Sequence, residues 1–209
     1  GEVAVGVPEY RMPVDKYNQD IECVRDMGVN FITNRRVNAD DMRAFEKDYD
    51  ATMISTGTRI SKKVYCENER KEIKGYWSAI EMLDEINLWE KYGIGQPVDL
   101  TGKTVVCVGG GFTSMDVVRC AIRANAKKVY MIYRRDEKTI IRNTTYEEYH
   151  EAVEEGVEFL FHSAVSAMVD EEDVLKSLMV DKFELVPDPN GGRAELVKIE
   201  GASYSIETE

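Results

Sequence analysis

The chain has 209 residues, 43% of them hydrophobic, and a formal net charge of −12 at pH 7. A chain of this length can bury roughly 70% of the surface that it exposes when unfolded, so we expect a globular protein. The acidic balance argues against nucleic acid or a membrane surface as a partner of the whole molecule, because both attract a positive field. No apolar run approaches the roughly 20 residues that cross a bilayer.

The four cysteines, Cys23, Cys66, Cys107 and Cys120, form no C-x-x-C pair, and the chain has only two histidines. This pattern fits neither a zinc site nor an iron–sulfur cluster, so we expect no metal in this chain. Buried, reduced thiols and a cytoplasmic location fit better. The chain starts without Met and without a leader sequence, which indicates a portion of a longer protein.

Helical and extended patterns alternate in the first half of the chain. Apolar residues spaced by three and four predict a helix over 14–27, which Gly28 ends. The stretches 29–33 and 49–55 are typical of strands. A polar segment around Asn38 predicts a short helix between them.

A charged, loop-like stretch over 59–75 precedes a helix that Ser78 can cap and that ends near Gly93. The segment 97–102 then has the composition of a linker. We therefore expect two domains, residues 1–98 and residues 99–209.

The second half begins with a predicted β-α-β unit. Residues 104–108 are typical of a buried strand, 113–124 of an amphipathic helix and 129–133 of a second strand. Parallel strands of this kind need helices packed against their sheet. Further along, Thr145 and Glu148 have the spacing of a capping box for another helix.

A strand over 157–161 and a long hairpin complete the prediction. The hairpin joins 176–186 to 194–200 through the turn Pro-Asp-Pro-Asn-Gly-Gly. The expected class is α/β: a Rossmann-like fold with a parallel sheet, helices and a β-hairpin or meander layer.

The first strand of this unit leads directly into a glycine-rich loop that opens the helix. Gly109 permits a tight turn, Gly111 lets the backbone approach a pyrophosphate, and the small Ser114 lets helix and strand pack closely. The N–H groups at the start of the helix would then face the phosphates. A purely structural glycine turn is the alternative. The predicted cofactor-binding residues here are Gly109, Gly110, Gly111, Phe112, Thr113 and Ser114.

The residues after the second strand bear on the choice of nucleotide. NAD enzymes often have an acidic residue there for the ribose 2′-OH, whereas this chain has Arg134 and Arg135 followed by Asp136. Two guanidinium groups suit a 2′-phosphate, although a solvated basic loop or ribose recognition by Asp136 are alternatives. Between Val117 and Lys138 seven basic residues face two acidic ones, a local charge of +5 that leaves −17 for the rest. We therefore predict NADPH rather than NADH.

Four other residues are weaker candidates. Asp116, early in the helix, is interpreted as structural, with a helix-dipole charge or a nicotinamide contact as alternatives. Phe112 either covers the cofactor or packs. His150 and His162 lack the neighbours of a catalytic group, and we assign no catalytic residue because hydride can pass between two cofactors without a general acid.

Five segments with a distinctive order extend over nearly the whole chain: Val7–Pro13, Tyr49–Gly57, Gly102–Asp116, Val129–Arg135 and Glu154–Leu160. Together they resemble the small (beta) subunit of NADPH-dependent glutamate synthase. They also resemble related flavin-dependent electron-input modules, including that of dihydropyrimidine dehydrogenase.

The resemblance implies an FAD-containing oxidoreductase. In it NADPH passes hydride to the flavin, and electrons leave through iron–sulfur clusters outside this chain to a glutamate-synthase large-subunit partner. It also implies that Gly109, Gly111, Thr113, Arg134 and Arg135 contact NADPH. The turn at Thr56 and Gly57 would lie near the flavin.

Three departures qualify this reading. The cysteine clusters and the first glycine fingerprint of the family are absent, the C-terminal part of the flavin site is absent, and Phe112 replaces a common Asn. We therefore expect a central portion, with part of an FAD domain followed by an NADPH domain. Alone it should bind NADPH weakly, hold FAD poorly and lack the activity of the parent.

Other functions stay open at this point. The parent can be an electron-input subunit for a hydrogenase, a ferredoxin or a pyrimidine-reducing partner. It can also be a non-catalytic dinucleotide sensor, or the β-α-β unit can be a scaffold only.

Overall fold

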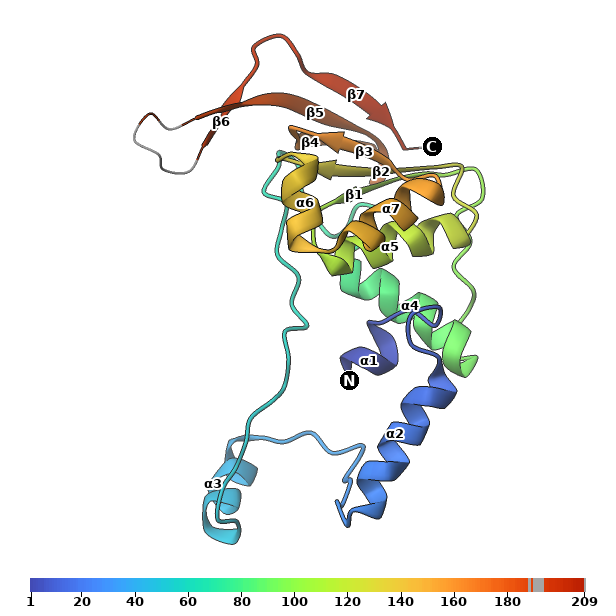
Figure 1. Cartoon of the computed structure of the whole chain (residues 1–209), viewed down its shortest axis with the longest axis vertical. Helices are drawn as coiled ribbons and strands as arrows, with labels where there is room; N and C mark the ends of the chain where they lie inside the picture. Colours follow the sequence, from blue (N-terminus) through green and yellow to red (C-terminus); the bar gives the residue numbers. More distant parts are fainter. Residues whose placement is uncertain (188, 190–193, 209) are drawn as a thin grey trace.

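The protein is described from a computed structural model that covers residues 1–187, 189 and 194–208. The strands lie together at one end of the molecule and most helices below them (Figure 1). In chain order the elements are α1 (Glu2–Val5), α2 (Val14–Asp26), α3 (Ala39–Asp48), α4 (Ala79–Tyr92), β1 (Thr104–Val108), α5 (Phe112–Arg123), β2 (Lys128–Tyr133), α6 (Glu137–Asn143), α7 (Tyr146–Glu154), β3 (Glu158–Phe161), β4 (Ser163–Glu171), β5 (Val174–Val186), β6 (Glu195–Lys198) and β7 (Tyr204–Glu207).

A parallel sheet in the order β1-β2-β3 contains the predicted β-α-β unit. Val108 of β1 pairs with Ile132 of β2, and Tyr133 of β2 pairs with Phe161 of β3. The carboxyl ends of the three strands therefore lie at one edge of the sheet. β1 pairs only with β2 among the described residues, so its other edge is unpaired.

A second, antiparallel sheet has the order β4-β5-β6, with β7 also paired to β5. The pairing of β5 with β6 confirms the predicted hairpin. Residues 188 and 190–192 of its turn lie outside the described residues. The strands β4 and β7 were not among the sequence-based expectations.

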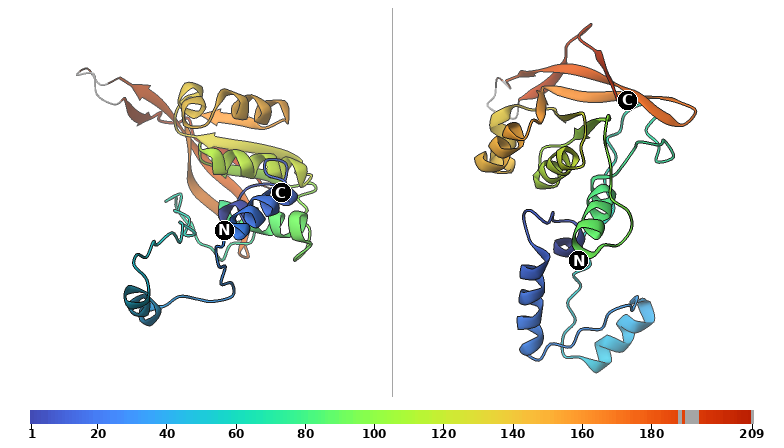
Figure 2. Two further views of the ribbon diagram at one scale, coloured as in Figure 1. Left: turned by 60° about the horizontal axis from the view of Figure 1, so that its bottom comes forward. Right: turned by 90° about the vertical axis from the view of Figure 1, so that its right-hand side faces the viewer.

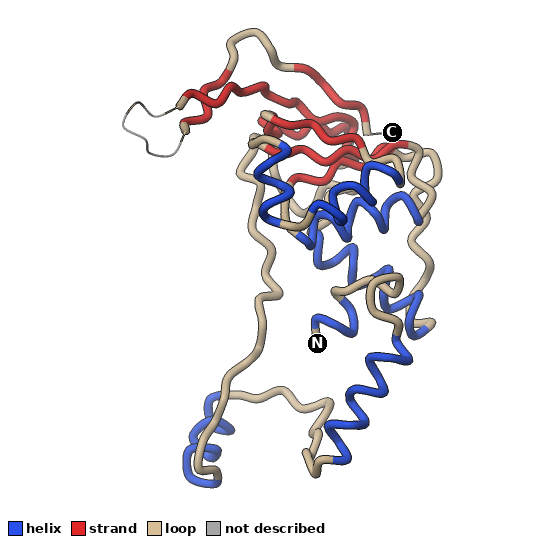
Figure 3. Tube along the Cα trace, in the orientation of Figure 1, coloured by secondary structure: helices blue, strands red, loops and turns tan. Residues whose placement is uncertain are grey.

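The parallel sheet lies between the helices and the antiparallel sheet (Figures 1 and 3). Successive side chains of a strand point to opposite faces, and β2 shows this clearly. Val129 and Met131 pack with α4, α5 and α7 in one core. Tyr130 and Ile132 pack against β4, β5 and β7 in the other. The result is the expected α/β class, with a three-layer arrangement.

The N-terminal helices α2 and α3 stand apart from both sheets (Figure 2). α2 is followed by Gly28 in a left-handed conformation, and Asn38 forms a capping box with Asp41 at the start of α3, so both predicted helices are confirmed. Neither helix has a buried residue. No helix in the described ranges is long and apolar enough to cross a membrane.

The predicted strands over 29–33 and 49–55 are wrong. Both stretches are without secondary structure and belong to no described ladder. A strand needs a neighbour to satisfy its backbone N–H and C=O groups, and the described chain places none beside them. Met53 and Ile54 are accordingly 91% and 70% exposed.

The helix predicted after Ser78 is confirmed as α4. Ser78 and Glu81 form its capping box, and Gly93 ends it in the left-handed region with φ of 63°. The buried face of α4 contributes Met82 and Leu83 to the core shared with α5. α4 thus covers the helical side of the parallel sheet. The domain division at residue 98 stays a prediction.

Candidate nucleotide-binding site

The glycine loop lies at the carboxyl edge of the parallel sheet, between β1 and α5. The Gly109 N–H donates to the Ile132 carbonyl at 3.1 Å, which fixes the start of the loop on β2. Gly111 is the N-cap of α5, with extended backbone and no side-chain cap. Four successive backbone N–H groups meet no acceptor among the described residues: those of Gly110, Gly111, Phe112 and Thr113. This end of α5 therefore has free donors for an anion.

The three glycines differ in what surrounds them. A Cβ on Gly109 would lie 2.1 Å from Ser114 Oγ, and one on Gly110 would lie 2.3 Å from the Tyr133 ring. These two glycines are needed for internal packing of the loop. A Cβ on Gly111 would meet nothing within 4 Å, so the space beside Gly111 is open to a ligand. The absence of crowding there fits a close-lying pyrophosphate.

The arginine loop follows β2 at the same edge. Arg134 is exposed and Arg135 half-buried, and neither guanidinium forms an ion pair with a residue that the structure describes. Asp136 is engaged elsewhere: its Oδ1 accepts from the Thr139 N–H at 2.9 Å and from the Thr139 hydroxyl, capping α6. The side-chain hydrogen bond from Thr139 lowers the pKa of Asp136. Its capping role makes Asp136 a poor candidate for the ribose.

The local positive charge is smaller than the sequence count suggests. Arg119 and Arg123 form ion pairs with Glu155, and Lys128 with Glu158. These cations are compensated by Glu155, the residue after α7, and by Glu158 of β3, which lie far along the chain but close in space. Lys127 precedes β2 at the opposite edge of the sheet, so the cations left near the glycine loop are Arg134, Arg135 and Lys138.

A buried ion-pair network lies behind the loop. Arg11 donates to Asp116 Oδ1 from Nε at 2.9 Å and from Nη2 at 2.6 Å, and it also binds both oxygens of Glu148. Burial raises the pKa of Asp116, and the Arg11 hydrogen bonds oppose this. The hydrogen bonds that Arg11 donates to Glu148 lower the pKa of that carboxyl group. Asp116 is therefore part of a structural network, in agreement with the sequence interpretation.

The network also explains an incomplete capping box. Thr145 Oγ1 accepts from the Glu148 N–H at 3.2 Å, as predicted. The Glu148 carboxylate, however, binds Arg11 and Arg119 instead of the Thr145 N–H. Ion pairing to two arginines thus replaces the reciprocal half of the predicted box.

Tyr10 completes the network on the side of α5. The ring centroid of Tyr10 lies 4.7 Å from the Arg119 guanidinium and 4.0 Å from that of Arg123. Its hydroxyl donates to Asp116 Oδ1 at 3.3 Å, and burial raises the pKa of this phenol. Sequence reasoning did not assign a role to Tyr10 or Arg11. The only signal was their place in the Val7–Pro13 motif.

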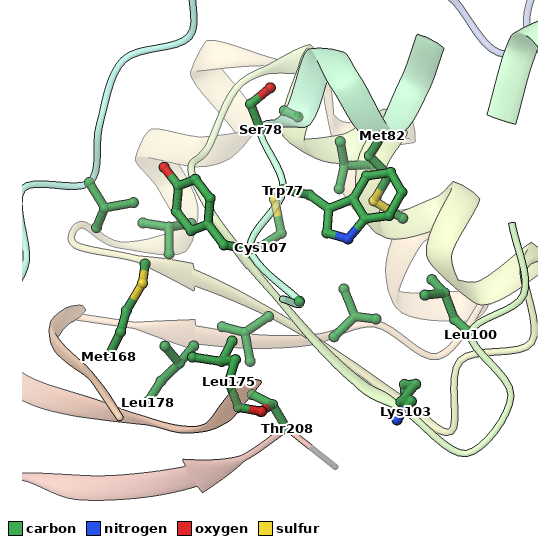
Figure 4. A pocket seen from close by; sticks show the side chains of 18 of the residues that line it. Trp77, Ser78, Met82, Leu100, Lys103, Cys107, Met168, Leu175, Leu178 and Thr208 are labelled. Atoms are coloured by element: carbon green, nitrogen blue, oxygen red, sulfur yellow. The ribbon is translucent and has the colours of Figure 1, made fainter. Parts of the chain in front are cut away.

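An apolar cavity of about 620 Å³ borders the unpaired edge of β1. Figure 4 shows Trp77 and Met82 on one side of it and Leu175 and Leu178 on the other. The cavity meets the glycine loop at Thr113. The loop thus lies between this cavity and the arginine loop. The cavity was not foreseen, because its walls come from segments that are distant in the sequence.

The other predicted residues are not gathered at this site. Thr56 and Gly57 are exposed coil residues, and no described residue hydrogen-bonds to them. Phe112 is 49% exposed at the start of α5. His150 lies on the surface of α7 beside Glu154, with 3.4 Å between Nδ1 and the carboxylate. Of the predicted cofactor-binding residues, the structure brings together those of the glycine loop, Phe112 included, and the two arginines.

This geometry agrees with a comparison to known families. The family described as pyridine nucleotide-disulphide oxidoreductase matches residues 3–188. The chain belongs to this family. It is therefore an FAD- and NAD(P)-binding oxidoreductase domain.

Characterised relatives of this oxidoreductase domain are subunits of larger enzymes. The chain is 32% identical over 207 residues to the NADP(+)-dependent formate dehydrogenase subunit beta of Moorella thermoacetica, with 99% of this chain and 28% of that protein covered. It is 31% identical to the NADPH-Fe(3+) oxidoreductase subunit beta of Geobacter sulfurreducens, covering 100% of this chain and 30% of the relative. It is 32% identical to the glutamate synthase [NADPH] small chain of Escherichia coli, covering 94% of this chain and 43% of the relative. The chain thus spans less than half of each of these relatives.

A solved structure supports the fold of this oxidoreductase domain. Histamine dehydrogenase from Rhizobium sp. 4-9 superposes with a TM-score of 0.60 over 100% of this chain and 29% of that chain, at 16% identity. At this identity the likeness shows the fold alone.

Proposed function

We propose that this chain is the NADPH-binding portion of an FAD-dependent oxidoreductase. In the full-length protein, NADPH bound here passes hydride to the flavin, and electrons continue to a partner of the glutamate-synthase type. The observation that carries the proposal is the pairing of two features at one sheet edge. Free N–H groups at the start of α5 lie beside Arg134 and Arg135, two cations without ion-pair partners in the described chain.

The residues present fit a dinucleotide phosphate at three points. The open space beside Gly111 admits the pyrophosphate, and the N–H groups of Gly110 to Thr113 can donate to it. Arg134 and Arg135 supply a bidentate partner for a 2′-phosphate. Asp136, which would favour the 2′-OH of NADH, instead caps α6. NADPH supplies the hydride when bound, and the chain supplies position and charge.

One glycine loop of this kind occurs at a strand–helix junction among the described residues, at Gly109–Ser114. We assign it to the nicotinamide nucleotide and not to FAD. The turn at Thr56 and Gly57 is proposed to reach the flavin in the full-length protein. FAD therefore depends on residues beyond those described.

A second candidate differs only in the electron acceptor. Relatives at similar identity carry the names formate dehydrogenase subunit beta and NADPH-Fe(3+) oxidoreductase subunit beta. The chain equally suits an electron-input subunit of such a reductase. Steady-state assays with glutamate synthase, formate dehydrogenase and ferric iron as acceptor systems distinguish these partners.

The test of the proposed function is rapid mixing of the full-length protein with NADPH or NADH. We expect NADPH to reduce the bound flavin much faster than NADH at equal concentration. Replacing Arg134 and Arg135 by Ala should lower the affinity ratio for NADPH over NADH by about tenfold or more, since each lost charge-assisted bond is worth about 1.5–3 kcal/mol. Arg25→Ala, on the exposed helix α2, is the control.

Three results would contradict the proposal. An unchanged NADPH-to-NADH ratio in the double variant would remove the role of the arginines. NADPH binding without any flavin reduction would instead support a non-catalytic nucleotide sensor. Calorimetry that detects binding of neither nucleotide would leave the glycine loop as a scaffold.

A further inference from the structure

His162 lies directly beside the arginine loop. It follows β3, whose last residue, Phe161, pairs with Tyr133 at the end of β2. The His162 N–H donates to the Arg135 carbonyl at 3.3 Å. The imidazole is therefore attached to the same sheet edge as Arg134 and Arg135, through a direct contact between the two connections.

His162 is held in an unfavourable state. Its φ of +51° lies in the left-handed region, which few residues other than Gly adopt and in which Asn, Asp and His are the commonest of the others. Its Nδ1 atom is buried and has no hydrogen-bond partner among the described residues. Strained backbone and unsatisfied buried polar atoms both lower stability, and both concentrate at functional sites.

The surrounding hydrogen bonds keep this conformation in place. The Phe183 N–H donates to the His162 carbonyl at 2.8 Å. Ser163 Oγ donates to the Phe161 carbonyl, also at 2.8 Å. The backbone is thus bound on both sides, to the parallel sheet and to β5. The backbone position of His162 at this sheet edge is therefore well defined.

The two ring nitrogens of His162 have different surroundings. A buried N–H without an acceptor is costly, so the neutral ring places its hydrogen on Nε2 and leaves a lone pair on Nδ1. Nε2, unlike Nδ1, is neither buried nor hydrogen-bonded in the described structure. The ring therefore offers one accessible donor beside the arginine loop.

We propose that His162 is a third ligand of the 2′-phosphate of NADPH, with Nε2–H donating to a phosphate oxygen next to Arg134 and Arg135. The inference rests on the proposed function and deepens it, because it assigns a further specificity-determining residue. A phosphate monoester has enough acceptor oxygens for all three side chains. The benefit of this contact explains why a histidine occupies a position better suited to glycine.

The test is His162→Gly in the full-length protein. Glycine removes the imidazole and relieves the left-handed strain, so thermal stability should stay equal or rise. We expect binding of NADPH and of 2′,5′-ADP to weaken by about tenfold or more in calorimetry, through the loss of one hydrogen bond to a charged group. Binding of NADH and 5′-AMP should be unchanged. His150→Ala, the histidine on the surface of α7, is the control and should alter none of these affinities.

Each other result overturns the inference. If His162→Gly lowered the affinities for NADPH and NADH equally, His162 would have a structural role only. If the affinity for NADPH were unchanged, His162 would have no role in binding. If the glycine variant does not fold, His162→Asn, which tolerates the same backbone conformation, provides the same comparison. A wild-type protein that binds 2′,5′-ADP no better than 5′-AMP would overturn the proposed function as well. A wild-type preference for 2′,5′-ADP that is undiminished in His162→Gly overturns this inference alone.

Discussion

Arg11 and Asp116 are 105 positions apart in the chain, and Nε and Nη2 of the arginine both donate to one oxygen of the aspartate, at 2.9 and 2.6 Å. Asp116 lies in α5 shortly after the glycine loop. The segment before α2 is therefore bound directly to the helix that begins at the candidate phosphate site. The same guanidinium reaches Glu148 of α7, so Arg11 joins three parts of the chain.

Removing this arginine should destabilise the fold. In Arg11→Met the buried carboxylate of Asp116 and the partly buried carboxylate of Glu148 lose their shared cation. Loss of one partner of a fully buried pair costs about 3–5 kcal/mol. Because the Arg11 side chain is 28% exposed, we expect about 2 kcal/mol, measured by urea unfolding.

A matched surface pair provides the control for this experiment. Arg43 pairs with Asp40 on α3, and both side chains are well exposed. Arg43→Met should change the free energy of unfolding by about 0.5 kcal/mol or less. If Arg11→Met and Arg43→Met lowered the free energy of unfolding equally, the network around Arg11 would contribute no more to stability than an exposed ion pair.

The contribution of Arg11 should also depend on pH. The Arg11 hydrogen bonds hold the pKa of Glu148 below its ordinary 4.5. As the pH falls, Glu148 is therefore protonated in the unfolded chain before it is protonated in the folded one. The stability that the Arg11–Glu148 pair contributes is complete above about pH 4.5, and it is lost as the pH falls through the lower pKa of Glu148 in the folded protein. The gap in unfolding free energy between wild type and Arg11→Met should therefore narrow from about pH 6 to pH 3. A constant gap over this range would contradict the assignment.

Two glycines of the loop should respond in opposite ways. Gly109→Ala forces a Cβ into Ser114 Oγ and should cost about 1–3 kcal/mol of stability. Ser114→Ala in the same chain should restore part of it. Gly111→Ser meets open space and provides an N-cap side chain, so the fold should be as stable as wild type or more so. Its NADPH affinity should nevertheless fall, because the side chain occupies the space beside the phosphates. Thermal unfolding and calorimetry separate the two effects.

The cysteines should differ strongly in reactivity. Burial raises the pKa of Cys107 and of Cys120 to about 12, whereas Cys23 is exposed. Since the thiolate is the nucleophile, iodoacetamide at about pH 8 should modify Cys23 in the folded protein. Mass spectrometry should find Cys107 and Cys120 modified only after denaturation. Rapid labelling of Cys107 in the folded state would show that β1 opens readily.

Sequence patterns were sufficient where local interactions decide the structure. The strand over 104–108 is found as predicted. α5 begins and ends one residue earlier than predicted, and β2 begins one residue earlier. Apolar periodicity and the glycines mark these elements locally. The loop and the arginines could be placed at one sheet edge for the same reason.

Predictions from sequence patterns failed where the local structure, or the pairing of a charge, depends on a residue far away in the sequence. The stretches 29–33 and 49–55 have strand-like composition, yet strand formation depends on a neighbouring strand. The contact of Arg11 with Asp116 is invisible to any local window. The charges of Arg119 and Arg123 were counted as available, although Glu155, directly after α7, forms ion pairs with both.

The lack of buried residues in α2 and α3 has a kinetic consequence. Isolated helices shorter than about 12–15 residues are marginal in water, and these two have 13 and 10 residues. Their amide hydrogens should exchange with deuterated solvent through local opening, long before those of β2 and α5. Hydrogen exchange of the isolated chain would then show two populations of amides, divided by tertiary packing and not by secondary structure.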